Sequence, residues 1–189
     1  MKVTEAIILA GVLLLFGPLM AQQDLPVYQA NPVSISNLPS STPFSNLSPN
    51  LSGIAYSEAS PANLAGDGNL NTSFLASATQ PGPAVRILYD LREKEYSSYA
   101  VTSIWIVNGK DADNFENYSR PKTLKLWING KAHGLIHLED SGQAQQIQTE
   151  ELLLLANKST EFGFEIIDVY PGDESEVAIT EILLDGTGE

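Results

Sequence analysis

Three stretches of the chain combine a strand-like run of apolar or alternating residues with residues that could recognise a ligand. They are Ser103–Lys110, Tyr118–Lys131 and Ile166–Asp185. In each, Asn, Gly, Tyr, Arg or Lys residues gather where the strand pattern ends, as expected when a rigid β scaffold presents a polar recognition edge. The chemistry they offer suits sugars, because an aromatic ring can cover the apolar face of a sugar while planar polar side chains hold its hydroxyls.

Six residues of these loops are the candidate ligand-binding residues: Asn108, Lys110, Tyr118, Arg120, Tyr170 and Asp173. They would lie close together if strands over 101–107 and 162–169 were neighbours that run in the same direction.

Structural explanations compete with recognition at these positions. The Asn-Gly pair at 108–109 could simply form a turn, and Tyr170 with Pro171 could pack its own loop. Arg120 could form an ion pair with Asp168 or Glu116, and most exposed ion pairs serve no recognition. The sequence leaves both explanations open.

A second candidate site is the loop Ala65–Phe74, in which Asp67, Asn69 and Thr72 supply oxygen atoms around an Asp-Gly turn. Calcium takes six to eight oxygen ligands, and a tight loop delivers carbonyl and side-chain oxygens around one point. The same residues also fit a simple turn in which Asp67 caps its own backbone. The residues alone do not decide between the metal site and the turn.

The three blocks, with Asp67-Gly68-Asn69 upstream, resemble discoidin-like, galactose-binding-type jelly rolls, in particular the glycan-binding domain of secreted bacterial NAD glycohydrolases. The resemblance covers about residues 52–187 and includes the loop signatures Asn108-Gly109, Arg120-Pro121-Lys122 and Asp168–Gly172. It implies a binding module rather than an enzyme, with a glycan or cell-surface carbohydrate as partner. It also implies a structural calcium held by the Asp67 loop and closed by Glu181, although Phe74 replaces the usual Trp.

Composition restricts the partners further. The 189 residues include 23 acidic and 10 basic ones, which gives a formal net charge of −13. Such an acidic surface repels phosphate backbones and anionic membranes, so nucleic-acid binding is not expected. The chain has no cysteine, so neither a disulfide framework nor lipoprotein attachment is expected.

The N-terminus resembles an export signal. Lys2 precedes the apolar run Ala6–Phe16, Gly17 and Pro18 break the helix, and Ala21 precedes a plausible cleavage site. The apolar run is short for a membrane span, which needs about 20 residues. We therefore expect a signal peptide over 1–21 and a secreted, periplasmic or cell-surface protein. An uncleaved signal that acts as an anchor is the alternative, and it would be the only contact with a membrane.

The remaining chain divides into a spacer and one folded domain. Residues 22–50 are rich in Pro, Ser, Asn and Gln, which predicts an extended, solvated linker because frequent prolines oppose helices and central strands. Residues 51–189 show short apolar runs separated by turn signals, including Asn129-Gly130 between two strand patterns. They predict an all-β antiparallel sandwich, which the resemblance narrows to a jelly roll.

The sequence lacks a catalytic signature. His133 and His137 lie on a predicted strand, where four residues span about 13 Å, which is too far for one metal ion. No nucleophile elbow and no phosphate-binding loop occur. The alternatives to glycan binding are a protein-interaction module of a bacterial envelope complex, favoured by the acidic loop at 173–176, and lipid recognition through Phe115 and Leu70, which the negative charge opposes.

Overall fold

The computed structural model of the chain describes residues 24–40, 50–53, 61–79, 81–91, 98–110 and 114–188. The expected signal peptide at 1–21 lies outside these ranges. None of the helices within them is long and apolar enough to cross a bilayer. The described residues form strands and two short 3-10 helices: β1 Val27–Val33, η1 Ile35–Asn37, β2 Asn50–Gly53, η3 Ala62–Gly66, β3 Phe74–Ser77, β4 Val85–Asp90, β5 Tyr99–Asn108, β6 Arg120–Ile128, β7 Lys131–His137, β8 Ala144–Leu154, β9 Ser159–Tyr170 and β10 Glu176–Gly188.

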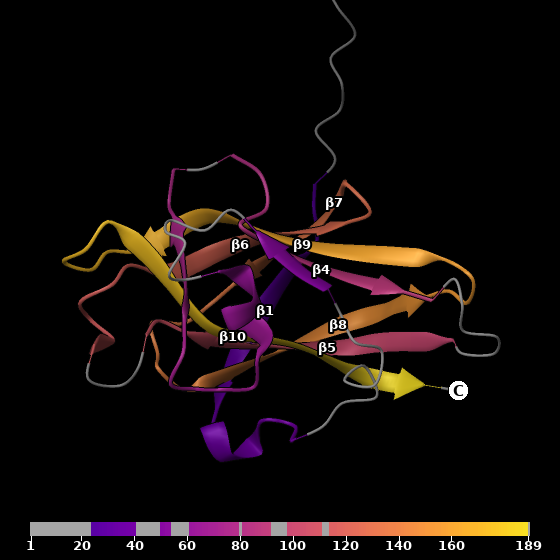
Figure 1. Cartoon of the computed structure of the whole chain (residues 1–189), viewed down its shortest axis with the longest axis horizontal. Helices are drawn as coiled ribbons and strands as arrows, with labels where there is room; N and C mark the ends of the chain where they lie inside the picture. Colours follow the sequence, from indigo (N-terminus) through magenta and orange to yellow (C-terminus); the bar gives the residue numbers. More distant parts are fainter. Residues whose placement is uncertain are drawn as a thin grey trace, which may run out of the picture.

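The strands form one curled sheet in the order β2-β4-β9-β6-β7-β1-β8-β5-β10-β3. It folds over at β1 into two facing layers, one with β4, β9, β6 and β7 and the other with β8, β5 and β10 (Figure 1). All strand pairs are antiparallel except β1 with β7, which is parallel. The expected all-β sandwich of jelly-roll type is therefore confirmed.

The core lies between the two layers. Alternate residues of β4 and β9 point inward, and Phe162 and Phe164 are fully buried together with Phe74 of β3. The 3-10 helix η3 packs against β2, β3 and β10, so it closes the side of the sandwich where the two edge strands would otherwise leave a gap. The inward-facing apolar residues of the two layers therefore build this core.

Strand β5 is buried on both faces, as its dense apolar sequence predicts. Ile104 and Ile106 point into the main core. Trp105 and Val107 belong to a second, outer cluster with Ala144. This outer cluster is covered by Val33, Leu38, Leu70 and Leu183.

Strand β1 corrects the expectation of a solvated spacer over 22–50. Residues 27–29 pair with β7, and residues 30–33 pair with β8, so β1 joins the two layers. Pro32 is tolerated because this half of β1 is bonded only to β8, and Pro is compatible with a strand that has one open side. Residues 27–33, which precede the predicted domain boundary, are thus an integral part of the sandwich.

A chain that begins at residue 39 should be markedly less stable than one that begins at residue 24. The shorter chain lacks β1 and uncovers the outer cluster by removing Val33 and Leu38, and each apolar side chain buried contributes about 1.5–3 kcal/mol. We expect the free energy of unfolding to fall by at least about 3 kcal/mol and the emission of Trp105 to shift to longer wavelength. Equal melting temperatures for the two chains would contradict the role of β1.

The strand register places the loops at two opposite ends of the sandwich. In the pairing of β5 with β10, Asn108 lies opposite Ile179, whereas Tyr99 lies opposite Gly188 at the C-terminal end of the chain. The loops that follow β5 and β9 therefore lie at the end away from the C-terminus (Figure 1). The predicted Asn129-Gly130 turn is confirmed, because both residues have positive φ (49° and 75°), as a two-residue hairpin turn requires.

Candidate functional site

Four chain segments meet at this end of the sandwich, and we call them the rim. They are residues 108–110, 114–120, 138–143 and 170–175. A backbone hydrogen bond joins the second and fourth segments, because Glu174 N donates to Asn117 O at 2.8 Å, while Gly109 N of the first segment donates to Ala178 O at 3.1 Å, just beyond the rim. Ser119 Oγ also lies 3.1 Å from Glu174 O and accepts from Gly172 N at 3.2 Å. The second and fourth segments of the rim are therefore held together by hydrogen bonds.

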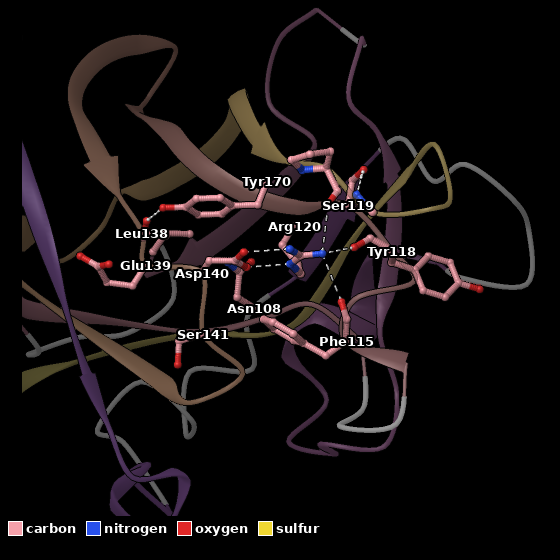
Figure 2. Close-up of polar contacts among 12 residues, drawn as sticks. Asn108, Phe115, Tyr118, Ser119, Arg120, Leu138, Glu139, Asp140, Ser141 and Tyr170 are labelled. Carbon is pink, nitrogen blue, oxygen red and sulfur yellow. Dashed lines mark hydrogen bonds and ion pairs between the residues drawn. The ribbon is translucent and has the colours of Figure 1, made fainter.

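Arg120 lies at the centre of the rim (Figure 2). Its Nε and Nη2 donate to the two carboxylate oxygens of Asp140 at 2.8 and 2.9 Å. Its Nη1 lies 2.9 Å from the carbonyl oxygen of Tyr118 and 3.4 Å from those of Phe115 and Pro171. The residue is only 5% exposed, so its donors are committed to holding three rim segments together.

The partner of Arg120 differs from both residues considered from sequence. The ion pair is formed with Asp140, not with Asp168 or Glu116. Asp168 instead pairs with Lys122, with Nζ and Oδ2 2.8 Å apart. Asp140 was not among the predicted site residues, because it lies 20 positions from Arg120 in a short turn that shows no motif.

Phe115 covers the guanidinium of Arg120, with 4.9 Å between the ring centroid and Cζ. The ring also lies on Gly109, where a Cβ would approach it to 2.7 Å and where φ is +79°. Gly109 is therefore required both by its backbone conformation and by this close approach. Phe115 packs within the rim, which argues against its role as the lipid-binding spike considered from the sequence.

Two tyrosines lie on either side of Arg120 (Figure 2). Tyr170 pairs with Arg120 in the register of β6 and β9, and its hydroxyl donates to Leu138 O at 3.0 Å. The Tyr118 ring lies beneath Lys110, whose Nζ is 4.6 Å from the ring centroid and 3.3 Å from the hydroxyl. Both tyrosines are partly exposed.

The other two candidates differ in accessibility. Asn108 is 1% exposed and donates from Nδ2 to Pro121 O at 2.8 Å, while its Oδ1 has no hydrogen-bond partner. Asp173 is exposed. The structure thus brings the six predicted residues to one rim, but β5 and β9 are not neighbouring strands as assumed, since they lie in different layers. Lys110, Tyr118, Tyr170 and Asp173 are accessible, whereas Asn108 and Arg120 lie beneath the surface.

The Asp67 loop forms the turn that the sequence suggested. Asp67 Oδ1 accepts from Asn69 N at 2.8 Å, and Asp67 Oδ2 accepts from the Thr72 hydroxyl at 2.8 Å. Thr72 N also donates to Asn69 O at 3.0 Å. Side-chain and carbonyl oxygens of three residues therefore face one another in a loop of six residues.

Glu181 of β10, the strand next to the edge strand β3, also contacts this loop. Its Oε2 accepts from Gly68 N at 3.1 Å, whereas its buried Oε1 has no hydrogen-bond partner. Burial, together with the negative charge of Asp67, raises the pKa of Glu181 to about 7, and the Gly68 hydrogen bond only partly offsets this. An unpartnered carboxylate oxygen beside a second carboxylate is an arrangement that a cation would stabilise.

The chemistry of the donor set fits calcium. Asp67 and Glu181 supply carboxylates, and Asn69 and Thr72 supply further oxygens, whereas soft nitrogen or sulfur ligands are lacking. The set contains only two carboxylates, and the described ranges contain no group of three or more His, Cys, Asp and Glu residues that could hold a metal ion. The oxygens of Asn69 and Thr72 would therefore have to complete the coordination.

A sequence profile of the NAD glycohydrolase translocation F5/8 type C domain matches residues 45–185, or 141 of the 189 residues. The chain therefore belongs to this family of discoidin-like domains. This confirms the family that the sequence resemblance suggested. A comparison with curated proteins finds no match.

Solved structures share the fold. The chain is similar to the CBM32-1 and CBM32-2 domains of Clostridium perfringens ZmpB in complex with GalNAc, with a TM-score of 0.57, 9% identity, and 89% of this chain and 42% of that chain covered. The same two domains in a second structure give a TM-score of 0.57 at 10% identity, covering 89% and 43%. A ZmpB structure that includes the M60 catalytic domain gives 0.54 at 7% identity, covering 89% and 17%. The chain thus spans less than half of each, and the likeness is one of fold.

Proposed function

We propose that this protein is a non-catalytic carbohydrate-binding module that binds a glycan at its rim and acts outside the cytoplasm. The observation that carries the proposal is the gathering of partly exposed Tyr118 and Tyr170 with polar side chains at one end of a discoidin-like sandwich. Aromatic rings beside hydrogen-bonding groups are what sugar recognition needs. The similar ZmpB domains were solved with GalNAc, which supports a carbohydrate ligand.

The accessible and buried candidates have different roles in this proposal. Lys110, Tyr118, Tyr170 and Asp173 contact the glycan. Arg120 and Asn108 act from below by positioning the segments that carry those residues. No role in binding is assigned to the histidines: His133 lies within β7, and His137 is the last residue of that strand.

Replacing Tyr118 with Ala should weaken glycan binding at least about tenfold, which corresponds to about 1.4 kcal/mol. The side chain is partly exposed, so the melting temperature should change little. The measurement is a glycan array followed by calorimetric titration of the best oligosaccharide. Leu153→Ala is a suitable control because Leu153 is 57% exposed and lies towards the opposite end of β8. Absence of binding by the unchanged protein across a broad array would overturn the proposal.

We further propose that the Asp67 loop holds a structural calcium ion, with Asp67, Asn69, Thr72 and Glu181 as its ligands. The ion would neutralise the two carboxylates and fix the loop against β10. The hydroxyl of Thr180, the next residue to Glu181, lies 3.1 Å from Ser73 Oγ and donates to Gly109 O at 2.7 Å. The ion would thereby also support the first segment of the rim.

The alternative function is that of a protein-interaction module of an envelope complex, in which the same fold binds a protein and not a sugar. It is favoured by the exposed acidic residues at 173 and 174, which suit a basic partner. A pull-down from the native envelope separates the two functions. Recovery of a stoichiometric protein whose binding is insensitive to added sugars would favour this second function.

A further inference from the structure

The accessible charge of the rim is negative. Glu116, Glu139, Asp173 and Glu174 are exposed, and none of them forms an ion pair with a residue of the described ranges. Three of them lie together, because the backbone hydrogen bond from Glu174 N to Asn117 O holds their two loops side by side. Glu139 lies on the other side of Arg120, where it is drawn pointing away from the guanidinium (Figure 2).

The positive side chains of the rim, and that of Lys122 just outside it beside the Tyr170 ring, do not compensate for these carboxylates. Arg120 is buried and committed to Asp140 and three carbonyl groups. Lys122 is paired with Asp168, and this hydrogen-bonded contact raises the pKa of Lys122. Lys110 lies over the Tyr118 ring as the one rim cation in the described part of the chain without a carboxylate partner.

A ligand at the rim therefore meets more negative than positive charge. Unpaired carboxylates within about one Debye length, about 8 Å at physiological salt, repel a second anion. The rest of the molecule adds to this repulsion, because the net charge is −13. A neutral sugar avoids this repulsion and still finds aromatic rings and hydrogen-bonding groups.

We propose, on the basis of the glycan-binding function above, that the rim selects glycans without acidic groups. Sialylated, uronic and sulfated glycans are rejected, and Glu116 and Glu174 are specificity-determining residues. These two carboxylates discriminate through charge and do not contact the neutral sugar. The discrimination should therefore depend on ionic strength, whereas binding of the neutral sugar should not.

The test uses glycan pairs in which one member carries an acidic group and the other does not, on an array and by calorimetric titration. The pairs are sialosides and their methyl esters, galacturonate and its methyl ester, and 6-sulfogalactose and galactose. Wherever a pair is bound, we expect the uncharged member to bind at least tenfold more tightly at 50 mM salt, with a smaller ratio at 500 mM salt. An acidic member that binds as tightly as its uncharged counterpart overturns the selectivity.

Variants assign the effect to the named residues. Glu116→Gln with Glu174→Gln should reduce the ratio at least threefold and leave the affinity for the uncharged member within twofold. The matched control is Glu150→Gln with Glu151→Gln, which removes the same charge from exposed positions on β8 outside the rim and should leave the ratio unchanged. An equal effect of the two pairs would overturn the assignment to the rim. Failure of the unchanged protein to bind any glycan would instead overturn the proposed function, and this inference with it.

Discussion

Arg120→Met should lower the free energy of unfolding by about 2–4 kcal/mol and abolish glycan binding. Methionine can replace the aliphatic stem against Phe115, but it leaves three carbonyl oxygens without a donor and Asp140 without its partner. For a chain of this length, the melting temperature should fall by roughly 5–15 °C. Binding should disappear because the rim segments are no longer held in one arrangement.

The control for this variant is Arg86→Met, which removes a guanidinium from an exposed ion pair. Arg86 Nη1 lies 2.7 Å from Glu161, but the two side chains are 40% and 33% exposed. Solvent screens such a pair, so this variant should cost less than about 1 kcal/mol and leave binding unchanged. Equal destabilisation by the two substitutions would show that the buried contacts of Arg120 contribute no more to stability than an exposed ion pair.

Asp140→Asn tests the same pair from the other side. The variant leaves the buried guanidinium of Arg120 with a neutral partner, and an uncompensated buried charge is strongly destabilising. We expect a loss of stability similar to that of Arg120→Met. Arg120→Lys should recover only part of the stability, because an ammonium group cannot form the two parallel hydrogen bonds to Asp140.

The strands were predictable wherever one face is apolar, and this accounts for most of the fold. Apolar patterns located β5, β6, β7, β9 and β10, and the Asn129-Gly130 turn fixed one register. The first half of β8 was missed because its sequence, residues 144–150, is mostly polar. Gln145, for example, is buried but satisfied by the backbone of Glu139, with hydrogen bonds of 2.7 and 3.0 Å. A buried polar residue that is satisfied by a backbone partner leaves no signal in hydrophobic periodicity.

The position of the site was predictable, but its internal arrangement was not. Loop composition after successive strands indicated one edge, and all six candidates lie at it, although β5 and β9 are not the neighbouring strands that were considered as a condition for this. Whether a polar side chain faces solvent or supports a neighbour depends on partners far away in sequence. Arg120 and Asn108 have the residue types of ligand-binding groups, yet both are at least nine-tenths buried. Residue type and spacing therefore located the rim. Only the three-dimensional structure distinguished its accessible residues from the buried ones that hold them in place.

In the presence of EDTA, we expect stability to fall as the pH rises from about 4.5 to about 7 because of Glu181. Its pKa is raised from 4.5 to about 7 in the folded protein, so the folded state binds a proton more tightly than the unfolded state over this range. The contribution is fully present below the unfolded pKa and is lost as the pH rises through the folded pKa. A raised pKa of this size corresponds to roughly 3 kcal/mol.

Glu181→Gln isolates this contribution from the many other acidic groups. The amide can still accept from Gly68 N, but it does not titrate, so the variant should lack this part of the pH dependence and be more stable than the unchanged protein at pH 8 in EDTA. Glu150→Gln, at an exposed position on β8, is the control and should follow the unchanged protein. Identical pH profiles for Glu181→Gln and the unchanged protein would contradict the assigned titration.

Calcium should reverse the effect at pH 8, because the ion stabilises the ionised form of Glu181 and of Asp67. A ligand present at 100 times its Kd raises the stability of the folded state by about 2.7 kcal/mol. We therefore expect the melting temperature to rise by roughly 5–10 °C when calcium replaces EDTA. Magnesium should have a smaller effect, since it demands a stricter octahedral geometry. Glu181→Gln and Asp67→Asn should each reduce the response to calcium, and superimposable melting curves of the unchanged protein in calcium and in EDTA would exclude a calcium ion from this loop.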